Sequence, residues 1–233
     1  MSNVKESDLQ NLPLPVRTWL QAAGAVGKPK TPQVRVVQSA RMRLKPEQKW
    51  MPVRAVQEFT TSPPGFTWRA RIQMGPLLFI TGRDTYAQGC GHMLIKLMSL
   101  IPVVNARGRE IDQGTLLRFL GEMVWFPQAA LQDYIRWEQI GPRQARASMT
   151  YRDVDGEGIF TFTEDGMPAS FTADRYREEN GTYTLRPWKI TISEHRTFGG
   201  LTAPSRGSVT WKLEDGDFTW FEFEITGIEH SGQ

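Results

Sequence analysis

Alternation of apolar and polar residues is the dominant pattern along this chain, and it predicts mostly β-structure. In the segment 66–74, apolar residues occupy the even positions and polar residues the odd ones. A period of two is typical of a strand with one face in a core. The links between such segments are short, which favours antiparallel neighbours. Comparable strand patterns occur at 34–44, 77–81, 146–152, 160–163, 171–176, 188–192, 209–213 and 218–228.

Turn signals divide these segments into hairpins. We expect turns at 82–86 (G-R-D-T-Y), at 164–167 (E-D-G-M) and at 213–218 (L-E-D-G-D-F). The last two contain an Asp-Gly pair, which favours a tight hairpin turn. Val37 is the one apolar residue out of phase in its strand, where a bulge is an option. Counting all segments predicts about ten or eleven strands, a number that goes with a strongly curved, half-barrel sheet.

Two regions have helical spacing. Prolines followed by a glycine delimit a short N-terminal helix at 15–23. The segment 110–131 is the strongest helix of the chain, with Asp112 as the expected N-cap. Pro127 ends this helix near Trp125 and opens a second one at 128–134. The apolar stripe of the first helix predicts packing against the concave face of the sheet. It consists of Leu116, Leu117, Leu120, Met123 and Val124.

These elements predict an α+β protein: a strongly curved antiparallel half-barrel, an N-terminal helix, and a central two-helix insert on the concave face. No repeat or low-complexity linker divides the 233 residues, so we expect a single domain over 1–233, with a flexible N-terminal tail at 1–11.

Composition is that of an ordinary globular protein, with 39% hydrophobic and 23% charged residues. The single cysteine, Cys90, excludes an internal disulfide. The N-terminus lacks the apolar core of a secretory signal, so the expected location is cytoplasmic. The most apolar run, 93–104, contains Lys96, Ser99 and Pro102 and is too short for a transmembrane segment.

The net charge of +3 is unevenly distributed, with basic residues in excess near the N-terminus and acidic residues in excess near the C-terminus. A polyanion-binding face is one interpretation. We favour the other, in which the two ends of the chain lie in one sheet and their charges pair across strands.

Arg118 and Glu122 are four residues apart and therefore neighbours on the predicted helix. The pair is either a solvated surface ion pair, the interpretation that we favour, or a buried acid held by an arginine beside a ligand. Glu122 with Arg118 is the candidate catalytic pair of this sequence.

Several motifs carry a resemblance to a known family. The segments K-P-E-Q-K-W-M-P-V-R-A, P-L-L-F-I-T-G-R-D, M-L-I-K-L-M-S-L, E-I-D-Q-G-T-L-L-R-F-L-G-E-M-V-W-F-P-Q-A-A-L and W-K-L-E-D-G-D-F-T-W-F resemble a bacterial family of unknown function. The resemblance runs from about Leu12 to His230 and implies no activity and no site residue. The order of elements is also similar, more weakly and without a shared motif, to the bacterial lipoprotein-carrier fold. That likeness concerns layout, and fold does not determine function.

Metal and cofactor chemistry find no support in the sequence. The three histidines, His92, His195 and His230, are far apart, and Cys90 with His92 forms at most half of a zinc site. No phosphate-binding glycine loop, dinucleotide fingerprint or nucleophile elbow occurs. We therefore expect no metal and no cofactor.

Nucleic-acid binding is an unlikely function for this chain. The basic run over 41–49 ends in the aromatic Trp50, but alternate arginines on a strand usually form its solvent face. A stacking motif of the RNA-recognition type is missing.

Three hypotheses for function remain. We favour non-enzymatic binding of a lipid or another apolar or amphipathic small molecule in a β-cup, since aromatic-lined concavities are where such ligands bind. Its expected ligand-binding residues are Trp68, Met123, Trp125, Phe126 and Trp188.

The alternatives are an enzyme and a partner-binding protein. The enzyme would use carboxylates, with Glu122 and either Asp112 or Asp174 as acid or base and Arg118 holding an anion. The structural protein would use Trp125 and Phe126 as an exposed aromatic contact. The sequence does not choose among oligomeric states.

Overall fold

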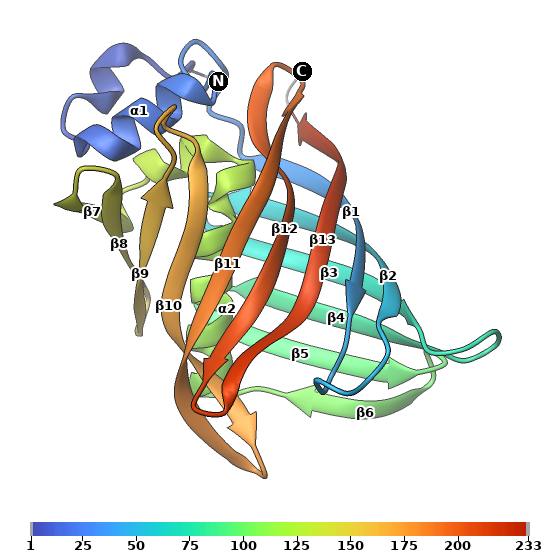
Figure 1. Cartoon of the computed structure of the whole chain (residues 1–233). Coiled ribbons are helices and arrows are strands. Elements are labelled where there is room, and N and C mark those ends of the chain that lie inside the picture. Colours follow the sequence, from blue (N-terminus) through green and yellow to red (C-terminus); the bar gives the residue numbers. More distant parts are fainter. Residues whose placement is uncertain (1, 232–233) are drawn as a thin grey trace.

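A computed structural model describes residues 2–231 of the chain. Thirteen antiparallel strands form one continuous sheet (Figure 1). Its order is β6-β5-β4-β3-β2-β1-β13-β12-β11-β10-β9-β8-β7, so that the first and last strands of the chain pair at its centre. The half-barrel is confirmed, whereas the expected number of ten or eleven strands was too low.

The strands of the first half of the sheet are β1 (Gln33–Met42), β2 (Met51–Thr61), β3 (Pro64–Gln73), β4 (Phe79–Ala87), β5 (Cys90–Leu97) and β6 (Ile101–Ala106). Those of the second half are β7 (Ile135–Gly141), β8 (Gln144–Tyr151), β9 (Val154–Phe162), β10 (Pro168–Glu179), β11 (Thr182–Phe198), β12 (Leu201–Leu213) and β13 (Gly216–Ser231).

No strand was predicted for β2, β5, β6 or β7, and the run 93–104 folds into most of β5 and β6. β4 was predicted only over 77–81, because the segment 82–86, which lies inside it, was assigned to a turn. The other turn predictions were correct, since 164–167 and 213–218 connect successive strands. The register of β1 against β13 shifts between Val37 and Gln38, but the extra residue is Thr226 of β13, and β1 pairs with β2 without a shift. The bulge considered at Val37 therefore lies in the partner strand, and Val37 itself faces outward.

The sheet curls around helix α2 (Arg109–Glu122), which lies on its concave face between the strands of the two halves (Figure 1). Its apolar stripe is buried as predicted. Each predicted stripe residue is at most 4% exposed. The two ends of the helix differ from the prediction. Gly108 is the N-cap in place of Asp112, and the regular helix stops at Glu122 instead of near Trp125. Two 3-10 helices follow, η2 (Met123–Trp125) and η3 (Pro127–Leu131), where a second α-helix was expected.

Glycines allow α2 to lie unusually close to the strands. A Cβ added at Gly121 on the helix would come within 2.7 Å of the ring of Phe171 on β10. A Cβ at Gly91 on β5 would meet the Thr115 hydroxyl at 2.5 Å. Real Cβ atoms do not approach other atoms so closely, so helix and sheet touch through backbone at these points.

The N-terminal region packs onto the end of the sheet formed by β7, β8 and β9. Helix α1 (Leu14–Ala22) confirms the predicted N-terminal helix and buries Trp19 completely. A flexible tail was expected at 1–11; its first residue lies outside the described residues, and residues 2–11 contain the 3-10 helix η1 (Glu6–Leu9). Val4 and Leu9 are buried there, which ties this segment to the core.

Charges pair across the central strands as expected from the distribution of acidic and basic residues. On the outer face, Arg35 of β1 lies 3.1 Å from Glu229 of β13, and Arg41 lies 2.6 Å from Glu222. The basic N-terminal and acidic C-terminal segments therefore neutralise each other in the sheet.

Candidate functional site

The candidate site is a charged cluster that joins α2 to the concave face. Arg118 of α2 donates from Nε to Glu122 Oε1 and from Nη1 to Asp84 Oδ2 of β4, each at 2.9 Å. These side chains are only 11–15% exposed. The interpretation of Arg118 and Glu122 as a solvated ion pair was therefore wrong, because the helix face that carries them packs against the sheet.

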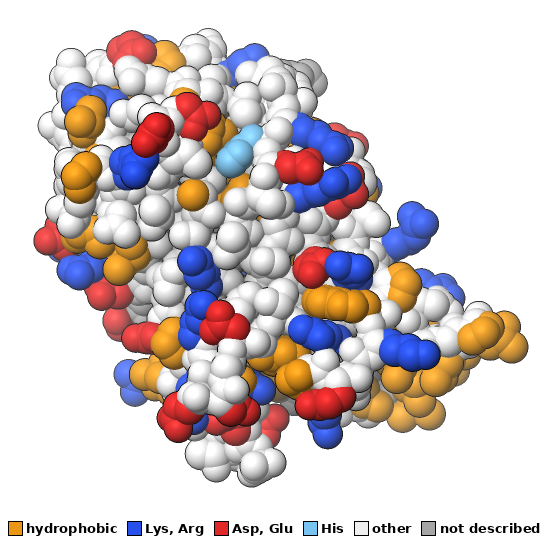
Figure 2. All heavy atoms as spheres, in the orientation of Figure 1, with side chains coloured by type: hydrophobic (Ala, Val, Ile, Leu, Met, Phe, Trp, Pro, Cys, Tyr) orange, Lys and Arg blue, Asp and Glu red, His pale blue; other side chains and the backbone are white. Residues whose placement is uncertain are grey.

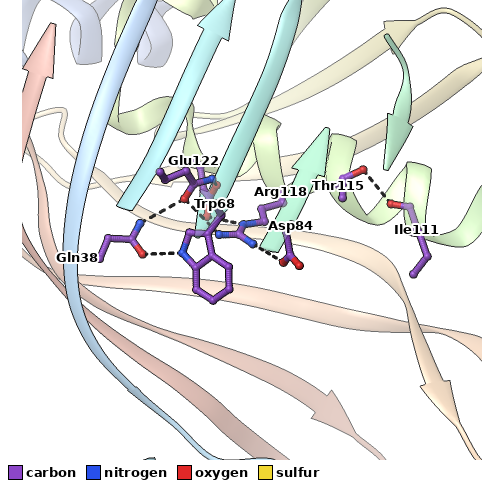
Figure 3. Close-up of polar contacts among 8 residues, drawn as sticks. Gln38, Trp68, Asp84, Ile111, Thr115, Arg118 and Glu122 are labelled. Atoms are coloured by element: carbon purple, nitrogen blue, oxygen red, sulfur yellow. Dashed lines mark hydrogen bonds and ion pairs between the residues drawn. The ribbon is translucent and has the colours of Figure 1, made fainter. Parts of the chain in front are cut away.

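Amide side chains complete the cluster (Figure 3). Gln57 of β2 donates from Nε2 to Glu122 Oε2 at 2.7 Å, and its Oε1 accepts from Arg118 at 3.2 Å. Gln38 of β1 donates to the same Gln57 oxygen at 3.3 Å and accepts from Trp68 Nε1 at 3.2 Å. The bonds link three neighbouring strands to the helix, and both oxygens of Glu122 are engaged.

Burial dominates the electrostatics of this cluster. It raises the pKa of the Asp84 and Glu122 carboxyl groups, while the positive charge of Arg118 acts in the opposite direction. Arg118 also lies over the rings of Phe66 and Trp68, with its Cζ 5.1 and 5.0 Å from their centroids. One guanidinium thus holds two buried carboxylates in an aromatic setting.

A second arginine stands beside this cluster without a partner. Arg175 of β10 is surrounded by protein and is half-buried. Among residues 2–231 it makes no hydrogen bond and no ion pair, unlike Arg118. Burial and the nearby charge of Arg118 lower the pKa of Arg175 to about 10, so it remains protonated at neutral pH.

The position of Arg175 is set by two neighbours. Its Cζ lies 5.0 Å from the centroid of the Trp188 ring on β11. On the helix side, Gly114 leaves room for the guanidinium, because a Cβ there would come within 3.0 Å of Arg175 Nε. The indole N–H of Trp188 is buried and finds no acceptor within the described part of the chain. Arg175 and Trp188 therefore offer donors that the protein itself leaves unused.

Several apolar side chains on the α2 side of the sheet are only half-buried, although they pack against the core. We call this part of the concave face the hollow. Its half-buried apolar residues are Met42 of β1, Met51 of β2, Ile80 of β4, Leu213 of β12 and Phe221 of β13.

The structure separates the five expected ligand-binding residues into two groups. Trp68 and Trp188 lie at the charged cluster and beside Arg175. Met123, Trp125 and Phe126 are 0–4% exposed and belong to the packed core. Trp125 donates its N–H to the carbonyl of Pro204 at 3.1 Å. An exposed contact made of Trp125 and Phe126 is therefore excluded, because η2 turns both rings inward.

The remaining candidates do not join the cluster. Asp112 accepts a hydrogen bond from the Gly91 amide at 2.6 Å, and Asp174 is exposed on β10. His92 bonds Asn105 and Arg107 on the outer face of the sheet. No group of acidic, histidine or cysteine side chains that could hold a metal ion occurs among residues 2–231. Within the same residues, no helix is long and apolar enough to span a bilayer.

Fold and site together define a half-barrel with a helix-filled interior and a partly open inner face that carries an unpaired cation. A family model described as a family of unknown function, DUF6544, matches residues 2–223. The chain belongs to this family. Comparison with curated protein sequences finds no match.

Solved structures show a distant likeness. A domain from Vibrio parahaemolyticus assigned to outer-membrane lipoprotein sorting is similar with a TM-score of 0.48 and 8% identity, over 86% of each chain. A DUF1329 family protein from Desulfovibrio piger is similar with a TM-score of 0.46 and 9% identity, over 99% of this chain and 95% of its own. A LolA superfamily protein from Nitrosomonas europaea has a TM-score of 0.41 and 10% identity, over 92% of each chain.

Proposed function

We propose that this protein binds an amphipathic small molecule, with an apolar chain and an anionic head group, on the inner face of its half-barrel. The observation that carries the proposal is Arg175, a half-buried guanidinium that makes no hydrogen bond and no ion pair among residues 2–231. Removing a charge from water, even in part, is costly when no hydrogen-bonded partner compensates for it. A carboxylate or phosphate head group would supply the missing partner and can bind a guanidinium through two parallel hydrogen bonds.

The apolar part of the ligand would lie along the hollow. Its residues are half-buried and face the same side of the sheet as Arg175. Covering apolar surface contributes about 25 cal/mol per Å², so a medium-length acyl chain would bind favourably there. Ligand sites commonly combine such a lining with a few converging polar groups.

A binding role fits the charged cluster better than general acid–base catalysis does. Both oxygens of Glu122 already accept hydrogen bonds, from Arg118 and from Gln57. A general acid or base needs a free oxygen within reach of its substrate. In this proposal the cluster positions α2, and Arg175 with Trp188 contacts the ligand.

The first experiment looks for a co-purified ligand. The protein is purified from cells without detergent, analysed by native mass spectrometry, and extracted with organic solvent. We expect an adduct that disappears on denaturation and an extract that contains an acidic lipid or another anionic amphiphile. Absence of an adduct alone would not decide the matter, so a direct titration is needed as well.

The second experiment titrates cis-parinaric acid, a fluorescent fatty acid, and its uncharged methyl ester. Saturable binding of the acid should weaken about tenfold in Arg175→Met, because one charge-assisted pair is lost, while binding of the ester changes little. Arg146→Met is the matched control, since Arg146 lies on the outer face of β8 and pairs with Glu138 at 2.9 Å. Failure of the protein to bind either probe, together with a lipid-free extract, would refute the proposal.

A further inference from the structure

Exposed apolar side chains gather at one end of the first half of the sheet. Seven of the eleven large apolar residues that are exposed belong to the β3–β4 turn, the β5–β6 turn and the adjoining strand β6. Figure 2 shows them as the orange group at the lower right. They are Met74, Leu77, Leu78, Met98, Leu100, Ile101 and Val103.

The two turns form one surface, which we call the apolar tip (the seven residues above). The amide of Met98 in the β5–β6 turn donates to the carbonyl of Phe79, at the start of β4, at 3.0 Å. Leu77 and Leu100 are the most prominent residues, being 87% and 78% exposed. Soluble domains rarely display such a group, and it marks a contact with a partner or a membrane.

Basic residues lie directly behind the tip on the outer face of the sheet. Arg54 of β2 is opposite Arg71 of β3, and Arg69 of β3 is opposite Arg83 of β4. Together with Lys96 of β5 they line a groove of about 730 Å³ that has no carboxylate in its lining. We call these five residues the basic groove.

Most of the basic groove lacks compensating charge. Arg69 pairs with Glu58 at 2.8 Å, while the other four cations have no ion-pair partner among residues 2–231. The outer face near β13 differs, since Arg41 there is matched by Glu222. Like charges placed opposite each other on neighbouring strands are destabilising. The groove is thus arranged to receive negative charge from outside.

Tip and groove are close enough to contact one planar surface. Lys96 precedes Met98 by two residues, which places it about 7 Å along the strand from the turn. Arg83 follows the start of β4 by four residues, about 13 Å away along the strand. The distance for Lys96 is within the screening length of about 8–10 Å at physiological salt, and that for Arg83 is longer. Lys96 therefore interacts directly with a charged surface that the leucines touch, and Arg83 interacts with it more weakly.

We infer that this end of the molecule docks on an anionic lipid bilayer. Leu77 and Leu100 enter the interface between head groups and acyl chains, and the basic groove faces the lipid phosphates. A nucleic acid would use the cations and leave the leucines in water. A second copy of this chain would bring its own unpaired cations against the same surface. The inference does not depend on a ligand in the hollow.

Vesicle flotation tests the inference, using the whole chain, vesicles of phosphatidylcholine, and vesicles that also contain phosphatidylglycerol. We expect flotation with the anionic vesicles, little with the neutral ones, and a decrease as salt is raised. Leu77→Ser with Leu100→Ser should weaken binding about tenfold or more. Arg71→Gln with Arg83→Gln should weaken it and reduce its dependence on salt.

Ile140→Ser is the matched control, because Ile140 is 37% exposed on β7 at the opposite edge of the sheet. Its binding should equal that of the wild type, and unchanged unfolding midpoints would show that all variants fold. The inference is overturned if the leucine variant floats as well as the wild type. It is equally overturned if the protein ignores vesicles but binds duplex DNA or RNA, or forms a dimer that the leucine variant abolishes.

Discussion

Arg118 of α2 and Asp84 of β4 are joined by an ion pair of 2.9 Å at a point where both side chains are about one-seventh exposed, 14% and 15%. The same guanidinium holds Glu122 at 2.9 Å, one helical turn further along α2. Arg118 therefore bonds both carboxylates that the curled sheet removes from water, and the nearby charge of Arg175 stabilises them further without a direct bond. The bonds of Arg118 restrict how far α2 can slide or rotate in the half-barrel.

Removal of Arg118 should destabilise the fold strongly. Arg118→Met keeps much of the length of the side chain but leaves Asp84 and Glu122 buried without the cation that bonds them. Breaking one partner of a buried pair typically costs about 3–5 kcal/mol. Urea unfolding at neutral pH should show a loss of this size.

Glu122→Gln is the comparison for that experiment. A glutamine keeps the shape and can still accept from Arg118, while it removes one buried negative charge. We expect a smaller loss of stability, about 1–2 kcal/mol, as typical of losing part of a charged hydrogen bond. Equal losses in both variants, or a loss under about 0.5 kcal/mol in Arg118→Met, would contradict the role of Arg118 as the central cation.

Most of the fold could be predicted from the sequence because binary patterning decides which face of each strand is buried. The even positions of 66–74 and the stripe of α2 were assigned to the core on that ground alone, and their apolar residues up to Ile72 are buried. One strand, β4, was predicted too short where patterning fails. β4 contains G-R-D-T-Y, whose inward residues are Gly82, Asp84 and Tyr86, so a charged residue occupies a core position and the segment resembles a turn.

The candidate site was only half predictable for a related reason. Arg118 and Glu122 are four residues apart on a helix, so their pairing could be predicted, but their burial depends on the strands that pack against them. Asp84, Gln57 and Arg175 come from distant strands. The sequence offered one signal for Arg175, which is its position in the alternation of β10. It follows Phe171 and Ala173 at intervals of two residues and so faces inward with them. A basic residue at an inward-facing position of a strand indicates a functional site better than an arginine at an outward-facing position does.

Close packing between α2 and β10 gives a second prediction. Gly121→Ala should destabilise the protein by about 1–3 kcal/mol, because its Cβ would lie 2.7 Å from the Phe171 ring. Alanine is otherwise the better helix former by about 1 kcal/mol, so the sign of the effect separates packing from propensity. The sign and size of the effect are read from the free energy of unfolding of Gly121→Ala and of the wild type.

A double-mutant cycle with Phe171→Leu tests the named contact. The smaller side chain makes room for the new methyl group, so Gly121→Ala should cost less in the Phe171→Leu protein than in the wild type. Additive effects, or a stabilising Gly121→Ala, would show that the helix does not approach β10 as closely as described.

Two partly buried histidines predict a loss of stability in mild acid. Burial lowers the pKa of both His195 and His230, and the positive charge of Lys28 lowers that of His230 further. The unfolded chain, whose histidines titrate near 6.5, then binds protons before the native state does. Stability is therefore retained above this pH and lost as the pH falls through the lower native pKa values.

The double variant His195→Gln with His230→Gln should flatten this dependence. Each histidine contributes at most about 1.4 kcal/mol per pH unit within its window. Unfolding free energies at a series of pH values between neutral and mildly acidic would show the difference in slope between wild type and variant. Parallel curves would mean that other groups control acid sensitivity.

The packing of α1 against the sheet depends on Trp19. We therefore expect two substitutions of Trp19 to differ in their cost to stability. The Trp19 ring is fully buried, with centroids 6.2 Å from Phe160, 6.0 Å from Phe162 and 6.4 Å from Trp137. Trp19→Ala should cost about 3–5 kcal/mol, since a large cavity remains between α1 and the sheet. Trp19→Phe should cost clearly less in urea unfolding. It refills most of the space, and the indole N–H has no hydrogen-bond partner within the described residues to lose. Similar costs for both variants would mean that the indole makes a polar contact that holds α1 in place.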